Sequence, residues 1–210
     1  MVNKTRPRGA ESPAAILRAA AQEFALRGYD AAGVDRIATR ARVNKAMIYY
    51  HYGSKLSLYL EVLRDMFRAV GARTRDIAEG PGSAEGKIDA WIQTLVEEAA
   101  ARPWFPPIML RELASGAAHI DKDTFSVMNG VYLSIRDVIL QGQREGAFRP
   151  VDPLLTYFTI LPSTLVFFAR QRVVARRKSA RGLAAAAPRD GDDFVRHMQG
   201  AARGMLRREI

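Results

Sequence analysis

Helix-breaking residues divide the first part of the chain into short segments, and this spacing limits the possible folds more than any other feature. The first apolar stripe at helical spacing ends at Gly28, a natural helix stop. A second, shorter stripe ends at Arg42-Val43, after which Asn44 is suited to cap a third helix, and Gly53-Ser54 ends that one. Two short helices joined by a tight turn, with another helix bracing them, are typical of a helix-turn-helix.

The remaining residues continue in the same helical style. Ser54 is suited to cap a long fourth helix, and further apolar stripes predict helices at 87–101, near 108–113 and at about 123–145. Asp152-Pro153 opens another helix, and Asp192 or Asp193 caps a last one. No segment alternates convincingly like a strand. We therefore predict an all-α fold of about nine helices, divided into a mobile basic arm (1–11), a three-helix helix-turn-helix domain (12–56) and a C-terminal helical domain (57–210).

Positive charge is concentrated where the short helices lie. The chain of 210 residues has a formal net charge of +10 and a pI near 10.3. Residues 1–60 hold ten Lys and Arg against four Asp and Glu, a balance of +6. Such a surplus favours a polyanionic partner, which could be DNA, RNA or an anionic membrane face.

Cysteine is absent, which excludes disulfides, thiolate metal sites and cysteine nucleophiles. The N-terminus is polar and basic, unlike a secretory signal. One uncharged stretch, PLLTYFTILPSTLVFFA at 153–169, allows two interpretations. It resembles a membrane span followed by positive residues, but it is short for a span of ~20 residues and contains hydroxyl residues and a proline. We expect a buried helix and no membrane partner.

A family resemblance appears in the stretches FALRGYDAAGV (24–34) and IATRARVNKAMIYYHYGSKLSLYLEVL (37–63). Residues 14–63 resemble the N-terminal domain of the tetracycline-repressor-like (TetR) transcriptional regulators in both spacing and residue type. The rest of the chain is similar to that family only in length and in helical style. The resemblance implies a bacterial, cytoplasmic, homodimeric DNA-binding regulator whose C-terminal domain binds a small-molecule effector.

The third helix carries residue types suited to a major groove. Its start has small or polar side chains, of which Lys45 can reach a guanine edge or a phosphate. Tyr49, Tyr50 and His51 have polar tips on rigid bodies, which suit phosphate contacts, and Lys55 lies beside a new helix N-terminus. The predicted DNA-binding residues are Gly33, Val34, Arg42, Asn44, Lys45, Ala46, Met47, Tyr49, Tyr50, His51 and Lys55.

Three positions depart from the family pattern. Arg42 stands where the family usually has a glycine in the turn, so it must adopt a right-handed conformation or cost about 1–2 kcal/mol of strain. Gly33 replaces the usual Ser or Thr cap of the second helix, which weakens that cap by a few tenths of a kcal/mol. Leu56 replaces an acidic residue after Lys55.

The C-terminal two-thirds holds many large apolar residues and no recognisable catalytic constellation. The resemblance implies a small-molecule pocket there, with a dimer interface formed by the last two helices. The predicted ligand-binding residues are Trp104, Phe105, Met109, Phe125, Met128, Tyr132, Tyr157, Leu161 and Phe168. The predicted dimer-interface residues are Thr164, Phe168, Met198 and Met205. Plain core packing is the alternative for each apolar residue, and Arg111 and Glu112 are candidate polar groups of the pocket or an ion pair.

The function predicted from the sequence is a ligand-responsive, sequence-specific transcriptional repressor. Its partners would be double-stranded DNA with a palindromic operator, a second copy of the chain and a small-molecule inducer. We expect no catalytic residue, no metal and no cofactor. The rivals are a membrane-anchored protein, an enzyme with a helix-turn-helix-like end, and a non-specific nucleoid-type DNA binder. The basic run Arg170–Arg181 fits either a solvated helix end or a second polyanion patch.

Overall fold

The computed structural model describes residues 13–176 and 191–207, and within these ranges the chain forms nine α-helices. They are α1 (Pro13–Ala31), α2 (Val34–Ala41), α3 (Lys45–Tyr52), α4 (Lys55–Glu79), α5 (Ala84–Ala101), α6 (Phe105–Ala114), α7 (Lys122–Arg144), α8 (Pro153–Arg176) and α9 (Gly191–Leu206). One isolated bridge joins Phe148 to Arg207. The prediction of an all-α fold is confirmed.

Helix ends follow the local capping signals. Gly28 leaves the helical conformation (φ 77°, ψ 174°), as its place in the sequence predicts, and only one short turn follows before Ala31. The Ser54 hydroxyl accepts a hydrogen bond from the Ser57 N–H, and Asp121 does the same for α7 from Thr124. The prediction for α9 was wrong in one detail. Because that helix starts at Gly191, Asp192 and Asp193 lie in its first turn and neither is the cap.

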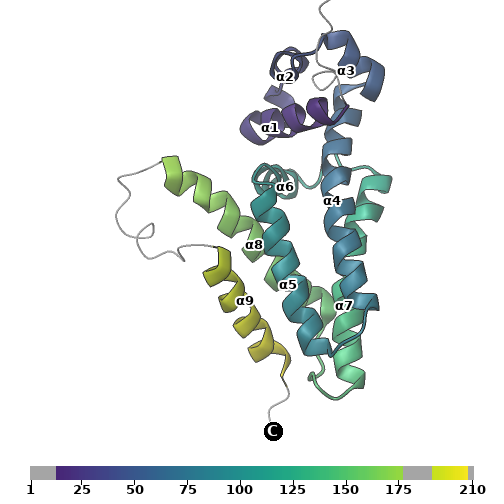
Figure 1. Ribbon diagram of the computed structural model, residues 1–210, viewed down its shortest axis with the longest axis vertical. Coiled ribbons are helices and arrows are strands. Elements are labelled where there is room, and N and C mark those ends of the chain that lie inside the picture. Colours follow the sequence, from purple (N-terminus) through teal and green to yellow (C-terminus); the bar gives the residue numbers. More distant parts are fainter. Residues whose placement is uncertain (1–12, 177–190, 208–210) are drawn as a thin grey trace, which may run out of the picture.

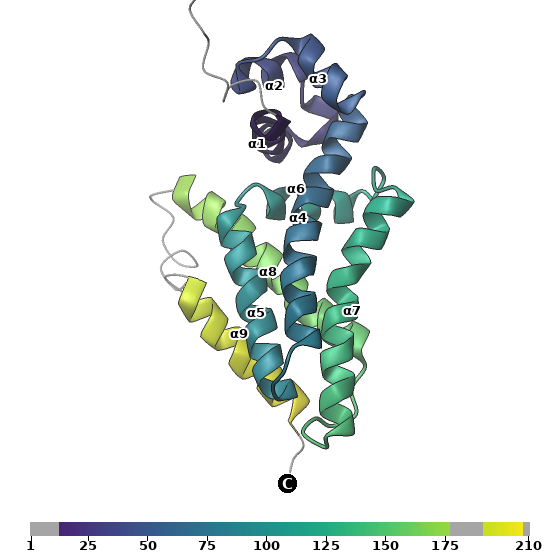
Figure 2. The same cartoon turned by 45° about the vertical axis from the view of Figure 1, so that its right-hand side comes forward.

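The molecule is elongated, and α4 joins its two parts. The first three helices form a head (residues 13–52) at one end, and α4 runs from the head into a body built of α5–α9 (Figure 1). Within the body α4 packs along α7, and α5 packs against α9 (Figure 2). Helix α6 lies where the head meets the body and contacts α1. No loop interrupts α4 between the two parts.

Helix α8 is the element that allowed a membrane interpretation. Residues 153–171 are long and apolar enough to span a bilayer by length and composition, a test that the core helix of a soluble protein also passes. In the structure α8 packs against α5, α6 and α7 and buries Ile160, Leu165 and Phe167. Its other face keeps apolar side chains exposed. The basic arm at 1–11 and residues 177–181 of the basic run lie outside the described residues.

Candidate nucleic-acid interface and effector cavity

A tight turn fixes the angle between α2 and α3. Arg42 adopts the left-handed conformation (φ 58°, ψ 40°), the Val43 N–H donates to the Ala38 carbonyl, and the Arg42 N–H donates to that of Thr39. This paired pattern is the Schellman ending of a helix, which usually places glycine where Arg42 stands. An arginine in this conformation costs about 1–2 kcal/mol. The strain foreseen in the sequence is therefore present at Arg42.

Helix α3 presents one face outward and holds the other on the head. The Asn44 side chain accepts a hydrogen bond from the Ala46 N–H (2.9 Å), which confirms Asn44 as the cap. Ile48 is buried, and the Tyr52 hydroxyl donates to the Pro13 carbonyl (2.9 Å), so these two anchor the helix. Outward lie Lys45, Ala46, Tyr49 and Tyr50, with the Tyr50 side chain 81% exposed.

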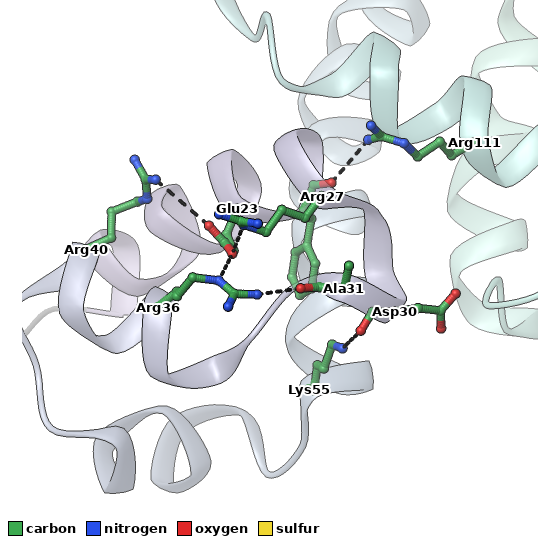
Figure 3. A network of polar contacts seen from close by, with 9 residues as sticks. Glu23, Arg27, Asp30, Ala31, Arg36, Arg40, Lys55 and Arg111 are labelled. Atoms are coloured by element: carbon green, nitrogen blue, oxygen red, sulfur yellow. Dashed lines mark hydrogen bonds and ion pairs between the residues drawn. The ribbon is translucent and has the colours of Figure 1, made fainter.

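The two lysines predicted to contact DNA already have partners within the head. The Lys45 ammonium lies 2.9 Å from an Asp35 oxygen, and this hydrogen bond raises the lysine pKa. Lys55 donates to the Asp30 carbonyl at 3.1 Å (Figure 3). Its ammonium also lies over the Tyr29 ring, 4.5 Å from the centroid. Both contacts are solvent-accessible, so a phosphate can exchange for them, but Lys55 also ties α4 to the end of α1.

The remaining predicted DNA-binding residues differ in how exposed their side chains are. Met47 and His51 are half-buried, and the Nε2 atom of His51 is buried without a hydrogen-bond partner among the described residues. The Val34 side chain is buried, which leaves its backbone as the group that can face a phosphate. Gly33 is the N-cap of α2 and supplies no side-chain bond, so the first N–H groups of α2 have no intrahelical acceptor.

A buried carboxylate that sequence reasoning missed holds α1 against α2. Glu23 is 1% exposed, and three arginines converge on it: Arg36 at 2.6 Å, Arg27 at 3.0 Å and Arg40 at 3.9 Å (Figure 3). Arg36 also donates to the Ala31 carbonyl. The available signal was the place of Glu23 on the apolar stripe of α1, since an acid on a buried face needs cationic partners.

Polar contacts also join the head to the body. Arg111 of α6 reaches from the body towards α1 (Figure 3), and it donates to the Ala25 carbonyl at 2.8 Å. Its neighbour Glu112 accepts a hydrogen bond from the Tyr59 hydroxyl (2.6 Å), and its carboxylate lies 2.9 Å from His119 Nδ1. Tyr59 and His119 both pack against Tyr29 of the head. The cluster Tyr29–Tyr59–Glu112–His119, called the junction cluster below, therefore spans α1, α4, α6 and the loop after α6.

The body contains a cavity of about 490 Å³, within the usual range for small-molecule sites, and the exposed side chains of Leu113, Phe125 and Phe158 lie at its open rim. Helices α4–α8 and the loop after α6 all contribute to its wall. Seven of the nine predicted ligand-binding residues line it: Phe105, Met109, Phe125, Met128, Tyr132, Tyr157 and Leu161. Trp104 and Phe168 do not, because Trp104 caps α6 and Phe168 packs edge-on against Phe167. Of the described residues on the wall, only Glu98 and Glu112 carry charge, and Glu98 was missed in the sequence.

The residues predicted for the dimer interface lie mostly inside the chain. Thr164 is 2% exposed and lines the cavity, and Phe168 and Met198 are also buried, while Met205 is half-buried. The inward position of Thr164 and Phe168 has no signal in the sequence, because α8 is apolar on all sides. The face that α8 leaves open instead carries Leu155 (67% exposed) and Val166, with Phe158 at the edge of this face, where it also lines the cavity. Any contact with a partner along α8 would be made by these residues.

Comparison with known proteins gives consistent matches. Residues 16–62 match the tetR family of bacterial regulatory proteins, and residues 85–181 match the tetracyclin repressor-like C-terminal domain. The HTH-type transcriptional repressor NicS of Pseudomonas putida is 25% identical over 155 residues, 73% of each chain. The HTH-type transcriptional activator FasR of Mycolicibacterium smegmatis is 55% identical over 49 residues, 23% of this chain and 22% of that protein. A solved tetR-family regulatory protein from Rhodococcus RHA1 shares the fold, with a TM-score of 0.75 at 18% identity over 97% of this chain and 100% of that one.

Proposed function

Because the chain belongs to the tetracycline-repressor-like family of bacterial transcriptional regulators, we propose that it is a ligand-responsive repressor. It binds a palindromic operator as a homodimer and leaves the operator when a small molecule fills the cavity. The observation that carries this proposal is the direct connection of an outward-facing α3 to an apolar cavity through the uninterrupted helix α4. Its place of action is the cytoplasm, where the bacterial chromosome lies.

Base contact in this proposal is made by the start of α3. Lys45 and Ala46 are exposed there, and a lysine can donate to a guanine edge while a small side chain lets the helix approach the bases. Tyr49 and Tyr50, with the first N–H groups of α2, then contact phosphates on the flanking backbone. Arg42 adds a cation at the turn.

A second copy of the chain is the proposed partner for the exposed face of α8. Leu155, Phe158 and Val166 are large apolar side chains on one helix, and their exposure in a single chain leaves an apolar strip that burial would stabilise. A two-fold axis through this strip presents two copies of α3 to successive major grooves, about 34 Å apart or a multiple of that. One α3 alone contacts too few base pairs for specificity.

The proposed effector response uses the junction cluster. Glu112 is both part of the cavity wall and the hydrogen-bond acceptor for Tyr59, and Tyr59 packs against Tyr29 of the head. A ligand that binds one arrangement of these helices more tightly than another shifts the population of head positions. The sign of regulation is taken from the relative NicS, which is a repressor.

Dimerisation and DNA binding are tested together by one substitution. Leu155→Glu places a charge in the proposed strip, and we expect a monomer by light scattering with at least a tenfold loss of affinity for the operator. The control is Leu140→Glu, at a leucine of α7 that is 36% exposed and lies outside the proposed strip, which should leave both properties unchanged. A Leu155→Glu protein that stays dimeric and binds normally would refute the proposed interface.

Specificity is tested with the wild-type protein. Affinity for the preferred site should exceed affinity for a scrambled sequence of the same composition by about 10³-fold or more at physiological salt. Equal affinity for the two would instead identify a non-specific nucleoid-type binder.

A further inference from the structure

The chemistry of the cavity wall narrows the class of molecule that it can hold. The wall is formed almost wholly by apolar and aromatic side chains. The part of a ligand inside the cavity loses its hydration, so each polar or charged group on that part needs a partner on the wall. The class of ligand therefore depends on which polar and charged partners the wall offers.

The wall offers no cation to an anionic ligand. Among the described residues that line the cavity there is no Lys, Arg or His, and its two charged side chains, Glu98 and Glu112, are both acids. An enclosed carboxylate, sulfonate or phosphate would be desolvated without a counter-charge and would face two negative groups. Such an arrangement is strongly unfavourable.

The same two carboxylates are also engaged with the protein's own groups. Glu98 is paired with Arg73 at 2.8 Å and with Arg102. Glu112 accepts the Tyr59 hydroxyl and faces His119. A cationic ligand would have to displace these partners, so the wall gives little advantage to a positive charge. The cavity is therefore built for a molecule whose enclosed part is uncharged.

Three polar side chains on the wall, Asn129, Tyr132 and Tyr157, make no hydrogen bond to the described part of the chain, and Tyr157 has the most aromatic rings packed around it. Tyr157 lines the cavity, its ring packs against Trp91 and Tyr132, and its hydroxyl has no hydrogen-bond partner in the part of the chain that the structure describes. Burial raises the pKa of Tyr157 to about 12, so the hydroxyl keeps its proton at neutral pH. It can both donate and accept one hydrogen bond.

We infer that the effector is an uncharged, largely apolar molecule bearing one hydrogen-bonding group that meets the Tyr157 hydroxyl, and that the cavity rejects anions of the same size and shape. This inference rests on the proposed function, since it names the class of effector for the same cavity. It adds Tyr157 as the residue that selects for a polar substituent.

The test compares two fluorescent probes that share one skeleton. N-phenyl-1-naphthylamine is uncharged, and 8-anilino-1-naphthalenesulfonate adds a sulfonate to it. We expect the uncharged probe to bind the wild-type protein at least about tenfold more tightly. Leu161→Trp fills the cavity and should abolish that binding, whereas Leu140→Trp, outside the wall, should not. Only the affinity that Leu161→Trp removes counts as cavity binding. Equal or tighter cavity binding of the sulfonate, or no cavity binding of the uncharged probe, would overturn the inference.

A second comparison isolates the role of Tyr157. Biphenyl and 4-phenylphenol compete with the bound probe, and 4-phenylphenol should be favoured by about 3- to 10-fold in the wild type, as expected for one hydrogen bond. Tyr157→Phe should remove this preference while leaving biphenyl unchanged. A preference that survives Tyr157→Phe would contradict the assignment.

Adding N-phenyl-1-naphthylamine to the protein–operator complex separates this inference from the proposed function. If the probe fills the cavity and the operator stays bound, the effector response is wrong and the ligand class stands. If the sulfonate binds the cavity and releases the operator, the ligand class is wrong and the effector response stands.

Discussion

Replacing Tyr59 by phenylalanine tests the junction cluster with the loss of a single atom. The Tyr59 hydroxyl donates to Glu112 at 2.6 Å, and both side chains are buried. Phenylalanine keeps the ring packing against Phe24 and Tyr29. Any change therefore reports the hydrogen bond between α4 and α6 and not the filling of space.

The expected magnitude follows from the groups involved. A hydrogen bond to a charged group contributes about 1.5–3 kcal/mol, and leaving a buried acceptor without a donor adds to its loss. Here Glu112 keeps its contact with His119 (2.9 Å), so we expect a value at the lower end, about 1.5–2 kcal/mol. For a chain of this size each kcal/mol shifts the melting temperature by roughly 2–4 °C, which predicts a fall of about 3–8 °C.

Alkaline pH provides a second signature of the same contact. Burial first, and then the hydrogen bond to Glu112, raise the pKa of Tyr59 well above its ordinary value of 10.0. The unfolded chain loses that proton near pH 10 while the folded chain keeps it, so wild-type stability falls as the pH rises above 10. Tyr59→Phe removes this contribution. The stability difference between wild type and variant should therefore narrow between pH 7 and pH 11.

Chemical denaturation at both pH values measures these differences. The matched control is Tyr132→Phe, because the Tyr132 hydroxyl has no hydrogen-bond partner within the described residues, and it should change stability by less than about 0.5 kcal/mol. Tyr59→Phe should also keep its operator affinity yet respond less to a cavity ligand. A variant as stable as the wild type at pH 7, or a gap that widens at pH 11, would refute the reasoning.

Three further predictions concern other contacts. Arg42→Gly should raise the free energy of unfolding by up to about 1 kcal/mol, because glycine adopts the left-handed conformation without strain. The same variant should bind DNA more weakly. Urea denaturation measures the stability, and a variant less stable than the wild type would contradict the prediction. Lys45→Ala should relax base preference at one position of each half-site, measured by selecting sites with the variant, and an unchanged preference would assign Lys45 to a phosphate. Hydrogen bonds from Thr124, followed by Arg64, lower the pKa of Asp121 from 3.8 to about 2. The stabilisation by the ionised Asp121 carboxylate is therefore complete above pH 4 and lost as the pH falls towards 2. Asp121→Asn should have a lower free energy of unfolding than the wild type in urea at pH 7, and this difference should vanish near pH 2. A difference that persists at pH 2 would contradict the prediction.

Local signals in the sequence were enough to place the helices of the head. Asn44 and Ser54 each have a side chain that can cap a helix and a following apolar stripe, and both act as caps. Gly28 ends the regular part of α1 because it can adopt a positive φ. These outcomes depend on residues a few positions apart. Periodicity and capping therefore predict them without knowledge of the fold.

Contacts between distant segments could not be predicted in the same way. Lys55 and Asp30 are far apart in sequence, and only the fold brings the lysine onto the end of α1. Likewise, the pairing of Lys45 with Asp35 depends on the angle set by the turn at Arg42.

Helix α8 shows a related limit for the C-terminal domain. An apolar helix without a polar side has no periodicity that tells its inward face from its outward one. Sequence reasoning therefore assigned Thr164 to a partner contact, whereas the fold directs it into the cavity and leaves Leu155 exposed. For the same reason Phe168 was predicted to line the cavity and does not.

In the proposed function, two copies of α3, held by a symmetric dimer, bind the DNA sequence. Selection of bound sites from random double-stranded DNA, followed by sequencing, tests it most directly. We expect an enriched inverted repeat whose half-sites are separated by about one helical turn, roughly 34 Å, or a multiple of it. Recovery of a single unrepeated half-site, or of no enriched sequence, would contradict DNA binding by a symmetric dimer.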